Sequence, residues 1–158
     1  MQNSANSSSG RPIKNRQAAL CIFYRADAVL LTSIQDAEGH LYHRPVGGGM
    51  ESGETPEQAV RREVMEELGL TLKTVPAPLP PIDHVWPWKL RDLHEKAWLF
   101  LVPSADYPEL ADGQTPEIVE PDGERFPTVW RPFDADAATL PPPCPATMMD
   151  AVRAALAK

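Results

Sequence analysis

The stretch GGGMESGETPEQAVRREVMEELGL, from Gly47 to Leu70, carries the clearest structural signal in the chain. Thr55 suits the N-cap of a helix, and Gln58 stands three positions later, as a capping box requires. A proline follows Thr55 at the first helical position, and Gly69 suits the position just after a helix ends. The sequence therefore predicts a helix over Pro56–Leu68.

Three glutamates on one face of this helix pose a physical problem. Glu63, Glu66 and Glu67 stand at positions i, i+3 and i+4, which are neighbours on a helix surface. Their like charges repel by roughly a few tenths of a kcal/mol per pair, in the last turns, where the helix dipole disfavours anions. A divalent cation would remove both penalties, and carboxylate oxygens suit Mg²⁺ or Mn²⁺. The alternative is a solvated helix face, since exposed glutamates are common.

The spacing around the glutamates favours the metal site. Gly48 is followed after five residues by Glu54, and after seven more by REVMEELGL, residues 62–70. Chance agreement with so many fixed identities falls below about one in a million. This pattern resembles the signature of the Nudix hydrolases. Every fixed position of that signature is filled here, by Gly48, Glu54, Arg62, Glu63, Glu66, Glu67 and Gly69, with Val64 and Leu70 at its apolar positions.

The resemblance implies a fold and a reaction. The fold is of the α/β (α+β) class, an α/β/α sandwich with a mixed β-sheet between helices. The reaction is that of a pyrophosphohydrolase, which cleaves a small nucleoside diphosphate derivative with Mg²⁺ or Mn²⁺ as the cofactor. Pyrophosphate hydrolysis needs charge neutralisation and an activated water, and clustered divalent ions provide both. A catalytically silent Nudix-fold module that binds or senses a nucleotide is the alternative, against which the complete set of glutamates argues.

The resemblance also implies roles for the motif residues. The three helix glutamates would hold the cations, and Glu63 or Glu67 would orient or deprotonate the attacking water. Gly48 or its neighbour would supply a main-chain carbonyl ligand. Glu54 and Arg62 are expected to brace the junction of loop and helix by ion pairing.

A further carboxylate is expected from the other side of the site. Many family members use a glutamate in the loop before a late strand, and here EPDGERFP (residues 120–127) precedes TVWRPF. Glu120 is the preferred metal ligand or base, and Glu124 is the second candidate. Asp122 is discounted because Asp-Gly is typical of a turn, in which Asp bonds its own backbone. Solvated loop charges are the alternative for all three.

The substrate-binding candidates are aromatic and basic. Trp86 and Trp88 lie in a proline-rich segment, Val75–Asp92, which reads as a long loop or a broken strand. Either indole could stack on a nucleobase or pack inside the protein. Arg44, just before the glycine run, is the further candidate. Trp86 stands sixteen positions after the motif, which hints at a nucleotide sugar such as ADP-ribose, and a nucleoside triphosphate remains open.

Composition limits the other classes of function. The 158 residues suggest one domain, predicted over residues 16–158 after a disordered tail at 1–15. The net charge of −7 argues against an extended nucleic-acid surface. The two cysteines, Cys21 and Cys144, lack CxxC partners, so a structural zinc site has no support. No apolar run reaches about 20 residues, so no membrane span and a cytoplasmic protein are expected. A homodimer is left open.

The rest of the chain reads as strands followed by one more helix. Period-two and apolar patterns, bounded by turn residues, mark the strands. The predicted strands are residues 17–25, 28–34, 40–46, 95–103, 117–119 and 128–133, and the predicted last helix is 145–157.

Overall fold

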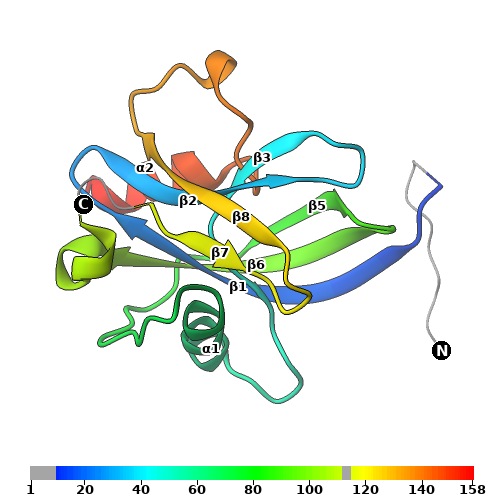
Figure 1. Cartoon of the computed structure of the whole chain (residues 1–158), viewed down its shortest axis with the longest axis horizontal. Helices are drawn as coiled ribbons and strands as arrows, with labels where there is room; N and C mark the ends of the chain where they lie inside the picture. Colours follow the sequence, from blue (N-terminus) through cyan, green and yellow to red (C-terminus); the bar gives the residue numbers. More distant parts are fainter. Residues whose placement is uncertain (1–9, 112–114) are drawn as a thin grey trace.

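The computed structural model describes residues 10–111 and 115–158, and within them a mixed β-sheet forms the centre of the molecule (Figure 1). Its strands lie in the order β5-β6-β1-β2-β8-β7, with β3 beside β2 and β4 beside β1. The strands are β1 (Ile13–Tyr24), β2 (Ala28–Gln35), β3 (Leu41–Arg44), β4 (Val46–Gly49), β5 (Ile82–Trp88), β6 (Arg91–Pro103), β7 (Glu117–Val119) and β8 (Arg125–Pro132). The helices are α1 (Pro56–Leu68) and α2 (Met148–Leu156), with short 3₁₀ turns at Ser104–Asp106, Pro108–Leu110 and Ala137–Thr139.

Strand β1 is the central element of the sheet. It pairs in parallel with β6 along its whole length, from Ile13 opposite Asp92 to Tyr24 opposite Pro103. Its other partners, β2 and β4, run antiparallel to it. This mixture of directions is the one that the sequence predicts.

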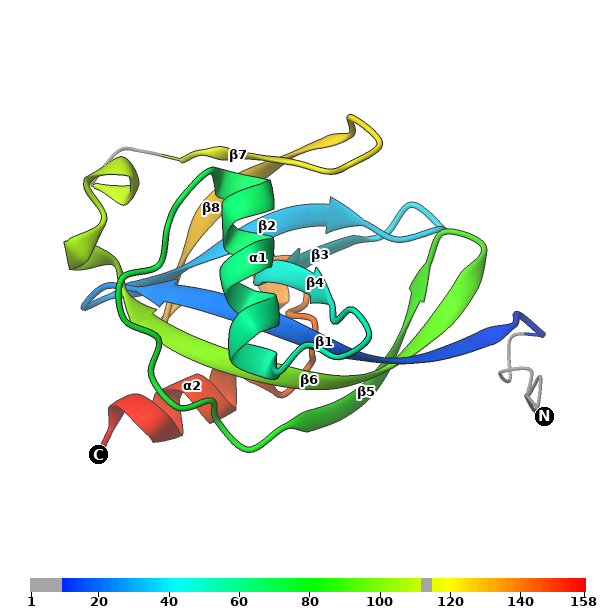
Figure 2. The same cartoon turned by 90° about the horizontal axis from the view of Figure 1, so that it is seen from below.

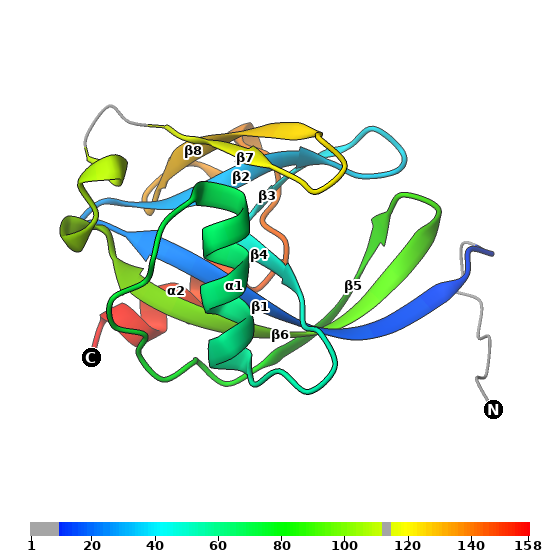
Figure 3. The same cartoon turned by 60° about the horizontal axis from the view of Figure 1, so that its bottom comes forward.

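The two helices cover opposite faces of the sheet (Figures 2 and 3). Alternate residues of β1 supply the two cores. The core under α1 includes Ala19, Cys21 and Phe23 of β1 with Val60 and Val64 of the helix. The core under α2 includes Ala18, Leu20 and Ile22 of β1 with Met148 and Val152. Because both faces of β1 are buried, the strand reads as a continuous apolar run. The predicted α/β/α sandwich is confirmed.

Helix α1 begins and ends where the sequence predicts. The Thr55 side chain accepts a hydrogen bond from the Gln58 backbone N–H at 3.2 Å, and Gln58 accepts one from the Thr55 N–H at 2.9 Å. Gly69 closes the helix in the left-handed conformation, with φ of 69°. The buried side of the helix contains Ala59, Val60, Val64 and, unexpectedly, Glu67. A carboxylate in a buried stripe costs free energy unless a partner compensates it.

Several expectations from the sequence need correction. The segment 75–92, expected as a long loop or a broken strand, contains β5, which forms a hairpin with β6. Strand β1 begins at Ile13, inside the expected tail, and residues 1–9 lie outside the described residues. The strand expected over 40–46 is split into β3 and β4 at Pro45, which lacks a backbone N–H for the ladder. The last helix begins at Met148 rather than at residue 145.

The glycine run, expected as a loop, begins as strand β4. Gly47 has a φ of +136°, and a Cβ at this position would lie 2.1 Å from the Ala19 carbonyl oxygen. Only glycine therefore permits this approach of β4 to β1. The approach places Gly48 and Gly49 between β1 and α1.

Neither α1 nor α2, in the described part of the chain, offers the apolar length that crossing a bilayer requires.

Candidate active site

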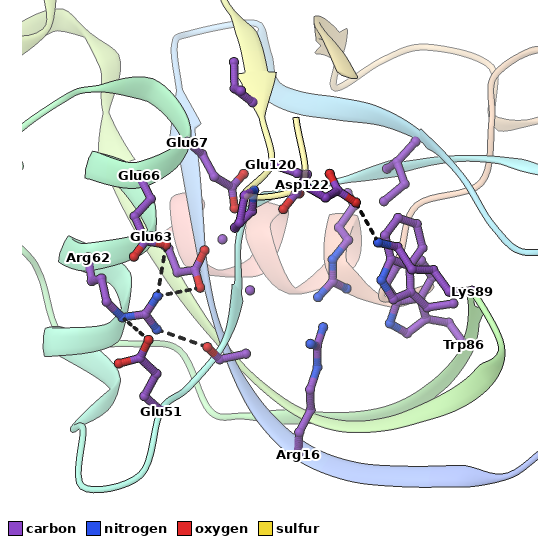
Figure 4. Close-up of a pocket in the computed structure, with 18 residues that line it drawn as sticks. Arg16, Glu51, Arg62, Glu63, Glu66, Glu67, Trp86, Lys89, Glu120 and Asp122 are labelled. Carbon is purple, nitrogen blue, oxygen red and sulfur yellow. Dashed lines mark hydrogen bonds and ion pairs between the residues drawn. The ribbon is translucent and has the colours of Figure 1, made fainter. Parts of the chain in front are cut away.

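A cavity of about 790 Å³ opens between α1, the β7–β8 loop and the β5–β6 hairpin (Figure 4). Its two sides carry different chemistry. The acidic wall consists of Glu63, Glu66 and Glu67 of α1 and Glu120 of the loop. The basic wall consists of Arg16, Arg44 and Lys89, and the rings of Trp86 and Trp88 lie beside Arg44 and Lys89. Residues from seven helices and strands meet in this cavity, although the motif itself accounts only for part of the acidic wall.

Arg62 fixes the acidic wall. Its Nε and Nη2 donate to the two Glu54 carboxylate oxygens at 2.7 and 2.9 Å, and Nη2 also donates to the Gly49 carbonyl at 3.1 Å. Its Nη1 donates to Glu63 at 2.9 Å and to Glu66 at 3.2 Å. The hydrogen bonds from Arg62 lower the pKa of Glu54 to about 2. This is the ion pairing that a bracing role for Arg62 and Glu54 requires.

Glu67 is the least compensated carboxyl group of the acidic wall. It is only 7% exposed. Burial raises the pKa of Glu67 to about 10, and the nearby charges of Glu120 and Glu63 act in the same direction. Burial and the charge of Glu63 likewise raise the pKa of Glu120. The helix and the loop thus bring together three carboxylates that repel one another.

These carboxylates fit a divalent cation. Within residues 10–111 and 115–158, no three acidic, histidine or cysteine side chains are already arranged around one metal position. The donor set is nevertheless suitable, because Glu63, Glu67 and Glu120 offer hard oxygen atoms and carry an excess of negative charge. Gly48 adds space beside them, since a Cβ there would lie 3.1 Å from a Glu63 oxygen. A bound cation would supply the missing positive charge.

A second charged cluster lies behind the basic wall, around Glu95 of β6. This glutamate is fully buried. It accepts hydrogen bonds from Arg16 Nε at 2.6 Å, Arg44 Nη2 at 3.1 Å and Trp86 Nε1 at 3.1 Å, and His84 Nε2 lies 3.0 Å away. Burial alone would raise the pKa of Glu95, but the charge of Arg44, the bond to His84 and the charge of Arg16 outweigh it and hold that pKa well below its usual range.

Comparison with known proteins leads to the same family as the sequence motif. A family model described as NUDIX domain matches residues 14–141.

This chain belongs to the Nudix family.

Among its relatives is the NAD-capped RNA hydrolase NudC of Klebsiella pneumoniae, 35% identical over 132 residues that cover 80% of this chain and 44% of the relative. The nucleoside triphosphatase NudI of an Enterobacter species is 52% identical over 46 residues, 29% of this chain and 27% of the relative. The solved MutT Nudix hydrolase of Burkholderia pseudomallei is 27% identical, with a TM-score of 0.56 over 78% of this chain and 87% of that one. The chain spans less than half the length of the NudC and NudI relatives.

The structure separates the two loop carboxylates that the Nudix resemblance suggested. Glu120 lines the cavity, whereas Glu124 does not and lies 3.8 Å from Lys89 Nζ. Asp122 forms the expected turn, since its side chain accepts the Glu124 backbone N–H at 2.9 Å, and it also pairs with Lys89 at 3.1 Å. The structure therefore places Glu120 at the cavity and Glu124 outside its lining, and the role of either residue as a metal ligand stays a prediction.

The two tryptophans occupy different positions. The indole of Trp86 is buried and bonded to Glu95, with the Arg44 guanidinium 4.6 Å from its ring centroid. Trp88 is half-buried and lines the cavity, with its ring 5.1 Å from that of Trp86. Trp86 is thus placed to support the basic wall, and Trp88 is the aromatic side chain better placed to meet a ligand.

The sequence reasoning missed Arg16, Lys89 and Glu95. The sequence marks Arg16 only as the first residue of the predicted domain, and Glu95 only as the first residue of a predicted strand. The register of β1 and β6, which sets Arg16 opposite Glu95, brings them together. The one local signal was a charged residue directly before each apolar strand, and such residues are common in exposed positions.

We expect Glu95→Gln to destabilise the protein by about 3–5 kcal/mol, because it leaves Arg16 and Arg44 without their buried counter-charge. Urea unfolding followed by circular dichroism measures this loss. Glu117→Gln is the matched control, since Glu117 pairs only at the surface with Arg125, and its effect should stay within about 0.5 kcal/mol. Equal unfolding midpoints for both variants would contradict this account of Glu95.

Proposed function

We propose that this chain hydrolyses the diphosphate linkage of a nucleoside diphosphate derivative, with Mg²⁺ or Mn²⁺ bound by the acidic wall. The observation that carries the proposal is the convergence of Glu63, Glu67 and Glu120 in one cavity with too little positive charge beside them. Burying Glu67 next to the carboxylates of Glu63 and Glu120 does not stabilise the fold. Membership of the Nudix family supports the same reaction.

The residues of the acidic wall would have two roles, metal binding and proton transfer. Glu63, Glu66 and Glu67 would hold the cations with the Gly48 carbonyl, Glu66 being partly exposed and free to leave Arg62. When bound, divalent cations supply charge neutralisation on phosphate oxygens and a more acidic water. Glu120, which reaches the acidic wall from the β7–β8 loop, would complete the ligand set or accept the proton of the attacking water. Glu63 and Glu67 are the other candidates for that proton transfer.

The aromatic side of the cavity would hold the nucleoside. Trp88 presents a half-buried indole whose ring lies 6.3 Å from that of Phe126 on β8. A base could stack on this surface with a free energy of roughly 1–3 kcal/mol. Arg44 would contact the phosphates from the neighbouring position on the basic wall.

The names of two relatives indicate which classes of substrate to consider for this chain. NudC is named for NAD-capped RNA and NudI for nucleoside triphosphates. Both names describe substrates in which a nucleoside carries linked phosphates. The proposal for this chain is therefore a nucleotide with a phosphoanhydride bond, either a nucleotide sugar such as ADP-ribose or a nucleoside triphosphate.

Glu67→Gln should lower kcat at least ~100-fold, because it removes a charge from the centre of the cation site. Phosphate release from a panel of nucleotides, at saturating Mg²⁺ or Mn²⁺, measures the effect. Millimolar Mg²⁺ should raise the Tm of the native chain and raise that of Glu67→Gln less. A native chain that binds a nucleotide and gains thermal stability, but hydrolyses none of the panel, would instead be a silent binding module.

Glu120→Gln and Glu124→Gln form a matched pair on one loop. We expect the first to lose most of its kcat, because its carboxylate lies in the cavity, and the second to stay within about twofold, because surface charges contribute little. Steady-state kinetics on the best substrate of the panel compares them, after circular dichroism has shown that both fold. Equal kcat values in the two variants would remove Glu120 from the site.

Trp88→Ala should raise KM by the equivalent of about 1–3 kcal/mol, the free energy of one base stack. Trp98 lies outside the cavity, where its indole donates to Gln17, so Trp98→Ala serves as the control and should leave KM unchanged. If Trp88→Ala folds and keeps the native KM, Trp88 only packs against its neighbours.

A further inference from the structure

The proposed cleavage gives Arg16 no role and uses Arg44 only as a contact to the phosphates. We propose that Arg16 and Arg44 form a receptor for a phosphate group beyond the diphosphate held by the acidic wall, so that the substrate is a nucleoside triphosphate. This inference rests on the proposed function and narrows its substrate class.

The receptor is built on three strands. Arg16 extends from β1, Arg44 from β3, and both contact the buried carboxylate of Glu95 on β6. Arg16 also contacts Glu95 through Nη2, and Arg44 Nη2 lies 3.0 Å from the second Glu95 oxygen. The carboxylate thus sits behind both guanidinium groups and fixes their orientation. Fixed donors bind an anion more tightly than mobile ones, because less side-chain entropy is lost on binding.

The charges of this cluster do not cancel. Two guanidinium groups share one carboxylate, and they are close enough for each to feel the charge of the other. A network that served stability alone would need only one arginine for Glu95, because a second buried cation adds repulsion and desolvation. The surplus charge therefore needs an anion, and the arginine fork matches the geometry of a phosphate group.

Donor groups remain available on the cavity side. Arg16 lines the cavity, its side chain is 23% exposed, and its Nη1 makes no hydrogen bond to any described residue. A Cβ on Gly49 would lie 3.0 Å from this Nη1, so the glycine leaves the guanidinium uncovered. Figure 4 shows the Arg16 side chain pointing into the cavity between the carboxylates and the aromatic side chains.

The place of the receptor fits the next phosphate of a linear chain. Strand β4 separates the two walls, with Gly48 against Glu63 and Gly49 against Arg16. A phosphate chain that is held at Glu63 and extends along β4 would therefore meet Arg16 next. At that position a nucleotide sugar presents a neutral ribose, which would leave the surplus charge unmatched. A nucleoside triphosphate presents a third phosphate there.

The test compares inorganic triphosphate with pyrophosphate, because these probes contain no base or sugar. Isothermal titration calorimetry in Mg²⁺ measures both affinities. We expect the native chain to bind triphosphate at least ~10-fold more tightly than pyrophosphate, as a charge-assisted pair of hydrogen bonds allows. Arg16→Gln should reduce that ratio to below about threefold. Circular dichroism checks that Arg16→Gln folds, which we expect because the side chain is partly exposed and Arg44 still pairs with Glu95.

Lys14→Gln is the matched control. Lys14 lies on the same strand, two residues from Arg16, carries the same charge, is exposed and does not line the cavity. It should keep the native ratio. Any one of three results would overturn the receptor. They are an unchanged ratio of triphosphate to pyrophosphate affinity in Arg16→Gln, an equal loss of that ratio in both variants, and no preference for triphosphate in the native chain.

The outcome is separable from that of the proposed function. If triphosphate binding depends on Arg16 but no nucleotide is hydrolysed, the receptor stands and the hydrolase proposal fails. If nucleotides are hydrolysed while the binding ratio ignores Arg16, the hydrolase proposal stands and the receptor fails.

Discussion

The parallel ladder between β1 and β6 is the interaction on which the rest of the structure depends. It runs from Ile13 opposite Asp92 to Tyr24 opposite Pro103. Parallel pairing between strands so far apart in sequence is stable only when both faces of the sheet are covered, and here α1 and α2 cover them. The same ladder sets Arg16 opposite Glu95 and so builds the basic wall. A shift of either strand by one residue would turn the side chain of that strand to the other face and so separate Arg16 from Glu95.

The cavity opposes two unbalanced charge clusters. On α1 and the β7–β8 loop, carboxylates exceed the cations that contact them, although Arg62 compensates Glu54, Glu63 and Glu66. Around Glu95, guanidinium groups exceed carboxylates. Each imbalance costs free energy in the protein alone. A ligand that is anionic and carries divalent cations would relieve both together, which would link the proposed metal site to the choice of substrate.

The proposed function also explains the places where the chain departs from the rules of stable folding. Glu67 lies in the buried stripe of α1, where an apolar residue would stabilise the helix packing more. Gly47 takes a backbone conformation that side chains rarely adopt, because β4 must approach β1 to carry Gly48 and Gly49 into the site. Lys89, at φ of 55°, turns the β5–β6 hairpin over the cavity and pairs with Asp122 of the facing loop. Such local costs are typical of functional sites.

The sequence by itself determined the elements whose signals are local. Capping residues and period marked α1 from its first residue to its last, and the fixed spacing of Gly48, Glu54 and the helix glutamates indicated the family and the acidic wall. It also indicated Glu120 ahead of Glu124, because a residue at the exit of a strand has a better fixed backbone. Only the tertiary structure decided the basic wall. Strand register pairs Arg16 with the buried Glu95. Packing of the β5–β6 hairpin buries Trp86 and leaves Trp88 half-buried at the cavity. Contacts between residues about eighty positions apart leave no periodic trace in a single sequence, because each residue type alone is equally compatible with an exposed surface.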